Sequence, residues 1–102
     1  MNYELFWTEP ALCDLEKIDR YLRRRNPAAA SKLGEEILAR IRVLASQPEL
    51  GRIYDPELPY RVWPHKSYRI FYRVKPHERV VEISHIRHAA RDNPTLDDLL
   101  TD

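Results

Sequence analysis

The apolar residues of this chain change their spacing once, near the middle of the sequence. In the first half they recur every three or four residues, as on one side of an α-helix, and from residue 60 they alternate, as on one face of a β-strand. The connection at 48–59 has neither period and carries three prolines and a glycine. This order predicts two helices followed by a small sheet, which is an α+β domain.

Two helices are expected in the first half, and each has a clear start. Thr8 before Pro10 and Asn26 before Pro27 both place a capping residue ahead of a first-turn proline. The arginines at 23–25 close the first helix, since cations suit the negative end of the helix dipole. The second helix is expected to reach about residue 47, so the two helices form an antiparallel hairpin.

The apolar stripes of these helices predict one core between the hairpin and the sheet. The opposite side of the first helix, with Asp14, Lys17, Asp19 and Arg20, is expected to face water. The predicted core residues are Leu15, Ile18, Leu22, Leu33, Ile37, Ile41, Tyr72, Val81 and Ile83.

Four strands are expected, which gives the order β-α-α-β-β-β in a single domain over residues 1–102 and a mainly antiparallel sheet. They cover about residues 2–7, 60–64, 67–75 and 79–88. In the third strand Tyr68, Ile70, Tyr72 and Val74 share the face expected to contact the helices. In the last strand Ile86 falls out of phase with Val81 and Ile83, which predicts a bulge near Ser84 and His85.

The net charge of +1 hides an uneven distribution of charge. Residues 58–92 hold eight Lys and Arg against three Asp and Glu, whereas residues 93–102 hold none against three. The basic stretch points to an anionic or acidic partner, although the same cations could simply solubilise one face of the sheet. The chain lacks a signal-like start and a long apolar run, so we expect a cytoplasmic protein with no membrane partner.

The sequence predicts no cofactor and no metal site. The single Cys13 lies in a helical pattern, and the histidines at 65, 77, 85 and 88 lack the spacing of zinc ligands. Only Gly34 and Gly51 are glycines, too few for a loop that cradles nucleotide phosphates.

Three segments carry a resemblance to a known family: TEPALCDLEKIDRYL at 8–22, SYRIFYRV at 67–74 and VVEISHIRHAARD at 80–92. Together they resemble the ParE/RelE superfamily of toxins from bacterial toxin–antitoxin pairs. The HAARD stretch at 88–92 is similar to the HGARD ending of ParE-type chains, with Ala89 in place of glycine. RelE-type ribonucleases usually carry a tyrosine near the C-terminus, and none follows Tyr72 here, so the ParE branch is favoured.

The resemblance implies a toxin that inhibits DNA gyrase by trapping the cleaved DNA complex. A ParD-like antitoxin would neutralise it in a hetero-oligomer. No residue would be catalytic, and the expected target contacts are Arg69, Arg73, Arg87, His88 and Arg91.

Two alternatives stay open. One is a RelE-type mRNA endonuclease acting on the ribosome, in which Arg69 would stabilise the phosphate and act with His88 and Arg91. The other is a family member kept only as a binding module.

The antitoxin is expected to need an exposed apolar surface, because such patches mark protein-binding sites. Four aromatic residues near strand ends and the connecting loop are the candidates, with core packing as the alternative. They are Trp7, Tyr54, Tyr60 and Trp63.

Overall fold

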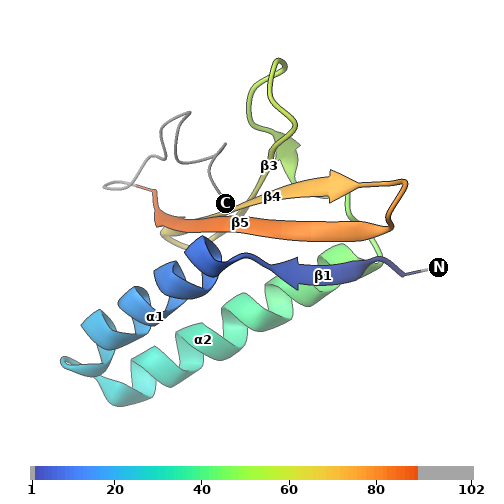
Figure 1. Cartoon of the computed structure of the whole chain (residues 1–102). Helices are drawn as coiled ribbons and strands as arrows, with labels where there is room; N and C mark the ends of the chain where they lie inside the picture. Colours follow the sequence, from blue (N-terminus) through green and yellow to red (C-terminus); the bar gives the residue numbers. More distant parts are fainter. Residues whose placement is uncertain (1, 90–102) are drawn as a thin grey trace.

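The computed structural model describes residues 2–89 and has two layers, with a helical hairpin on one face of a five-stranded sheet (Figure 1). The sheet order is β1-β5-β4-β3-β2; β1 runs parallel to β5 and the other neighbours are antiparallel. The elements are β1 (Glu4–Trp7), α1 (Glu9–Arg23), α2 (Pro27–Arg42), the 3-10 helix η1 (Val43–Ala45), β2 (Arg52–Ile53), β3 (Arg61–His65), β4 (Tyr68–Lys75) and β5 (Val80–His88).

The predicted element order is confirmed apart from one strand. The connection at 48–59 was expected to hold no strand, but Arg52 and Ile53 pair with β3 to form the short edge strand β2. A strand of two residues is too short to show an alternation of apolar and polar residues, so the sequence did not indicate β2. In the described part of the chain, neither helix is both long and apolar enough to cross a bilayer.

Both helices start as the capping signals predict. Thr8 Oγ1 accepts a hydrogen bond from Ala11 N at 3.3 Å, and Asn26 Oδ1 accepts one from Ala29 N at 3.1 Å. Thr8 also donates from Oγ1 to the carbonyl of Ile83 at 2.8 Å. This residue therefore fixes the start of α1 to β5.

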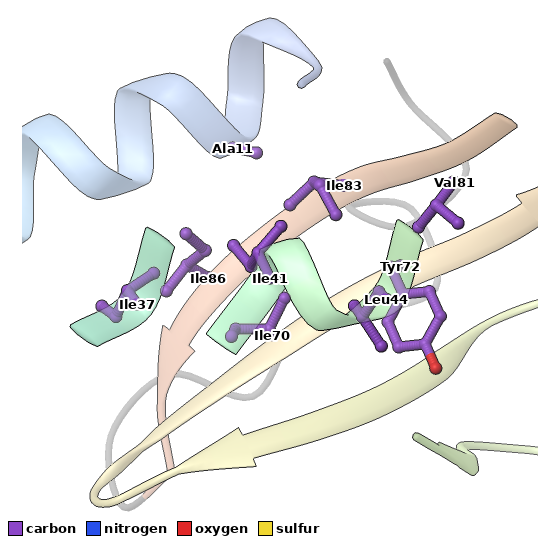
Figure 2. Packing of buried hydrophobic residues seen from close by; sticks show 9 residues of the cluster. All are labelled: Ala11, Ile37, Ile41, Leu44, Ile70, Tyr72, Val81, Ile83 and Ile86. Atoms are coloured by element: carbon purple, nitrogen blue, oxygen red, sulfur yellow. The ribbon is translucent and has the colours of Figure 1, made fainter. Parts of the chain in front are cut away.

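The core lies between the helices and the sheet (Figure 2). Leu15, Ile18 and Leu33 pack on it while partly buried, but Leu22 lines a groove near the end of the hairpin. Figure 1 shows the reason, since the turn between α1 and α2 lies beyond the end of β5. The buried cluster consists of Ala11, Ile37, Ile41, Leu44, Ile70, Tyr72, Val81, Ile83 and Ile86.

The predicted bulge in β5 is confirmed. Tyr72 pairs with Ile83, but the next pair joins Phe71 to His85, so Ser84 has no partner in β4. The extra residue changes the phase of the strand, and Ile86 therefore enters the core.

Tyr72 closes the core beneath the 48–59 connection. Its hydroxyl donates to the carbonyl of Pro48 at 2.7 Å and accepts from Gly51 N at 2.8 Å, and burial raises its pKa. A Cβ at position 51 would lie 2.6 Å from that hydroxyl and 2.8 Å from the carbonyl oxygen of Val62. Only glycine fits there.

Candidate functional site

The sheet face opposite the helices gathers cations from the last two strands. Arg69 pairs across the ladder with Arg87, Phe71 with His85, and Arg73 with Glu82. Cross-strand partners share a face, and the neighbours Ile70, Tyr72 and Ile86 all lie on the helix side. We call this surface the basic face and define it by Arg69, Arg73, Lys75, His85 and Arg87.

One end of the basic face is partly neutralised. The carboxylate of Glu82 is buried, with Lys75 Nζ at 3.0 Å and Arg73 Nη2 at 3.2 Å. Two cations therefore share one buried carboxylate, an arrangement that holds β4 to β5 on this side.

The other end is dominated by Arg69, which has no carboxylate partner in the part of the chain that the structure describes. Its Nε and Nη2 atoms are buried and make no hydrogen bond within that part, while its guanidinium lies 5.4 Å from the centre of the Phe71 ring. Buried N–H groups without acceptors are costly and uncommon in folded proteins. Because no carboxylate of the described residues pairs with Arg69, the charge of its guanidinium is left for a carboxylate or a phosphate from elsewhere.

Asp14 was expected to face water, and this expectation was wrong. Its Oδ2 accepts a hydrogen bond from Ile86 N at 3.0 Å and lies 3.3 Å from His85 Nδ1 and 3.4 Å from Arg87 Nε. The reason is topological. The pairing of β1 with β5 stops at Ile83, so α1 covers the edge of β5 beyond that point. Asp14 thus holds one side of the basic face in place.

A second surface runs along the helical hairpin and forms a groove of about 670 Å³, which we call the hairpin groove. Charged residues of α1 and its C-cap, among them Asp19, Arg20 and Arg24, line it together with the apolar residues. The apolar lining consists of Leu15, Ile18, Leu22, Ala30, Leu33 and Leu38. The sequence did not indicate this groove, because it assigned most of these residues to a closed core.

Metal binding finds no support among residues 2–89, where no group of three His, Cys, Asp or Glu side chains could hold an ion. Cys13 is exposed on α1.

A family model described as "ParE toxin of type II toxin-antitoxin system, parDE" matches residues 5–93. The chain belongs to the ParE toxin family. It is therefore a toxin of a type II toxin–antitoxin system, as the motifs around the last two strands indicate. No curated protein sequence matches the chain.

Solved structures share the fold of this ParE-family chain. A structure of the chromosomal ParDE system from P. aeruginosa matches with a TM-score of 0.72 at 23% identity, over 84% of this chain and 95% of that one. A structure of a mutant E. coli toxin RelE in the free state matches with a TM-score of 0.67 at 19% sequence identity, over 87% of this chain and 85% of that one. A structure of the intact E. coli RelBE toxin–antitoxin complex matches with a TM-score of 0.66 at 20% sequence identity, over 87% of this chain and 99% of that one.

In this ParE-family fold, the residues predicted to contact the target do not all lie on the same face of the sheet. Arg69, Arg73 and Arg87 share the basic face, whereas His88 pairs with Tyr68 on the helix side, their ring centres 5.3 Å apart. Arg91 lies outside the described residues. The set predicted for a ribonuclease is divided too, because Arg69 and His88 lie on opposite faces of the sheet.

The four aromatic candidates for antitoxin binding do not form one surface in this toxin. Trp7 and Trp63 pack against the helix-side core, and Trp63 donates from Nε1 to the carbonyl of Arg40 at 3.0 Å. Tyr54 and the buried Tyr60 pack with Phe71 in a second cluster. Their role in antitoxin binding stays a prediction.

Proposed function

We propose that this ParE-family toxin inhibits DNA gyrase in the cytoplasm and is neutralised by a ParD-like antitoxin. The observation that carries the proposal is the match of the ParE family model over residues 5–93. The basic face supports it, since clustered cations attract an acidic protein surface or the DNA held by the enzyme.

Inhibition by binding requires no proton transfer, and the basic face fits that requirement. His85 is the one histidine on it among the described residues. It is 4% exposed, and its Nδ1 lies 3.3 Å from Asp14 Oδ2 and 3.1 Å from Arg87 Nη2. An imidazole held in this way positions its neighbours and is poorly placed to take a proton from a substrate. We assign Arg69, Arg73, Arg87 and Arg91 to target binding.

A RelE-type mRNA endonuclease is the second candidate, and one observation favours it. The guanidinium of Arg69 has no carboxylate partner among the described residues, and its charge suits the phosphate of a cleaved RNA as well as a carboxylate. Cleavage would also need a general acid and a general base beside Arg69. On Arg69's side of the sheet, the described part of β5 offers only two candidates: the restrained His85, and Glu82, whose carboxylate already pairs with Arg73 and Lys75.

The antitoxin is assigned to the hairpin groove. Both the P. aeruginosa ParDE system and the E. coli RelBE complex are toxin–antitoxin assemblies, so a protein partner is expected for this chain. The groove offers the larger apolar surface, with Leu38 at 37% exposure, whereas Tyr60 at 3% offers almost none. Neutralisation then takes the form of a toxin–antitoxin hetero-oligomer.

The target is tested by two parallel assays. Purified protein is incubated with gyrase, ATP and supercoiled plasmid, and separately with programmed ribosomes. The variants are Arg69→Ala and Arg91→Ala, with Arg42→Ala as a control that removes the same charge from an exposed position on α2. We expect gyrase-dependent linear DNA from the wild type and Arg42→Ala, less from the other two variants, and no codon-dependent cuts in mRNA.

Other outcomes reject the gyrase assignment. Ribosome-dependent cuts that fall on the order of a hundredfold or more in a folded Arg69→Ala protein establish the endonuclease instead. If the protein is active in neither assay, the remaining hypothesis is a family member that is kept only as a binding module.

A further inference from the structure

Gly34 has no structural reason to be glycine within the described part of the chain. It lies in the middle of the 16-residue helix α2, and its φ is not positive. A Cβ built on it meets no atom within 4 Å. Glycine inside a helix is less stable than alanine by about 1 kcal/mol, so this residue weakens the helix without relieving any contact.

The only other glycine shows what an internal reason looks like. At Gly51 an added Cβ would lie 2.6 Å from the hydroxyl of Tyr72. The fold itself excludes a side chain there. At Gly34 nothing in residues 2–89 excludes one, so the packing of these residues does not account for the glycine.

The position of Gly34 in the hairpin groove indicates another reason for the glycine. Leu38 lies one helical turn further along α2, and Leu15 and Leu22 line the same groove from α1. Apolar side chains thus surround a position that has no side chain. Such a hole accepts a bulky side chain from a facing helix.

The charges along the groove identify the partner helix more closely. Arg23 is paired with Asp19 at 2.7 Å, but Arg20 and Arg24 make no ion pair with any residue that the structure describes. Arg20 lies on the last turn of α1 and Arg24 directly follows the helix, so the end of the groove near the hairpin turn is cationic. A complementary helix carries acidic residues at that end.

From the hole and the charge pattern, we propose that Gly34 is the docking position for one large apolar side chain of an amphipathic antitoxin helix, whose acidic residues lie toward Arg20 and Arg24. The inference rests on the proposed antitoxin partner and specifies how it binds. Glycine at 34 lowers the stability of the free toxin and makes the complex possible.

The test measures folding and binding in the same variants. Gly34→Ala and Gly34→Leu are compared with Ala39→Leu, which adds bulk to an exposed position of α2 outside the groove. Urea unfolding is followed for each free toxin. Binding of the cognate ParD-like antitoxin is measured by calorimetry, and self-association by analytical ultracentrifugation.

We expect Gly34→Ala to raise the urea midpoint of the free toxin and yet weaken binding severalfold. Filling the hole with Gly34→Leu should weaken binding by roughly ten- to a hundredfold, as overpacking of a close contact does. Ala39→Leu should bind as the wild type does.

The inference is overturned if Gly34→Leu binds as tightly as Ala39→Leu while the wild type also binds, a result that leaves the antitoxin proposal intact. It is also overturned if Gly34→Leu instead dissociates a dimer of the free toxin, since the groove then holds a second copy. Absence of binding by the wild type rejects the antitoxin proposal itself.

Discussion

The two faces of the sheet use residues of the same strands for opposite purposes. On the helix side, Ile70, Tyr72 and Ile86 are at most 1% exposed, and the tyrosine hydroxyl has both a donor and an acceptor. On the other side, Arg69 keeps two buried nitrogen atoms without acceptors in the described structure. One face satisfies its groups internally, whereas the other leaves donors for something else to satisfy.

This difference separates folding from function. Side chains on the helix side should contribute mainly to the free energy of unfolding, because their contacts are all within the chain. Arg69 on the basic face should contribute little to it or oppose it, because its buried N–H groups find no acceptor in the described structure.

The largest expected effect is on the helix side. Ile37→Ala should lower the free energy of unfolding by about 2 to 5 kcal/mol, since the side chain is fully buried and its removal leaves a cavity. Urea denaturation measures this loss. Leu38→Ala is the matched control on the same helix, where a side chain that is 37% exposed should lose much less. Equal losses at the two positions would mean that the buried side of α2 has been assigned wrongly.

The edge between the two faces should respond next. Asp14→Ala leaves Ile86 N–H without its acceptor and removes the carboxylate beside His85 and Arg87, so a loss of about 1 to 3 kcal/mol is expected. Asp14→Asn keeps an oxygen acceptor and should lose less. Both are measured by urea denaturation, and a fully stable Asp14→Ala would remove Asp14 from its role at this edge.

Replacing Arg69 on the basic face should cause almost no change in stability. Arg69→Met keeps much of the side-chain volume and removes the unpartnered N–H groups, so the free energy of unfolding should stay within about 0.5 kcal/mol of wild type or rise. Thermal and urea denaturation measure it. A loss above about 1.5 kcal/mol would show that Arg69 stabilises the fold and would end the contrast between the faces.

The smallest expected effect is on the pH dependence of stability, and it comes from an ion pair between α2 and the end of β3. The pKa of the Glu36 carboxyl is lowered from 4.5 to about 2 by two neighbouring groups. Lys66 Nζ lies 2.8 Å from Glu36 Oε1, and His65 Nε2 lies 3.0 Å from the same oxygen. A lowered pKa stabilises the folded state above pH 4.5, and this contribution disappears as the pH falls from about 4.5 toward about 2. The group is partly exposed, so solvent screens the interaction.

The melting temperature of Glu36→Gln, measured from pH 7 down to pH 3, should therefore be slightly below that of the wild type at neutral pH. The gap should narrow as the pH falls below 4.5. A gap that widens below pH 4.5 would contradict the assigned pKa.

The sequence predicted those elements that have a regular pattern of residues over several positions. Stripes, caps and alternation located both helices and the three long strands, and the phase of Ile86 indicated the bulge. It missed contacts between distant segments. Asp14 and Ile86 are 72 positions apart, and the polar side of an amphipathic helix gives no sign that a strand edge will meet it.

The candidate site was predicted in part for the same reason. Alternation placed Arg69 and Arg73 on one face, but the direction of His85, Arg87 and His88 depended on where the bulge falls. The hairpin groove depends on how far the hairpin extends beyond the sheet, which no local pattern encodes.

The position of Asp14 over the open edge of β5 has a consequence for solubility. An uncovered strand edge is a template for pairing with the same edge of another molecule, and sheets that pair in this way grow into aggregates. The carboxylate of Asp14 occupies the N–H group of Ile86 that such pairing would use, and it places a charge where a second strand would have to approach. Asp14→Ala is therefore expected to precipitate at concentrations where the wild type stays dispersed, even under conditions in which both are folded.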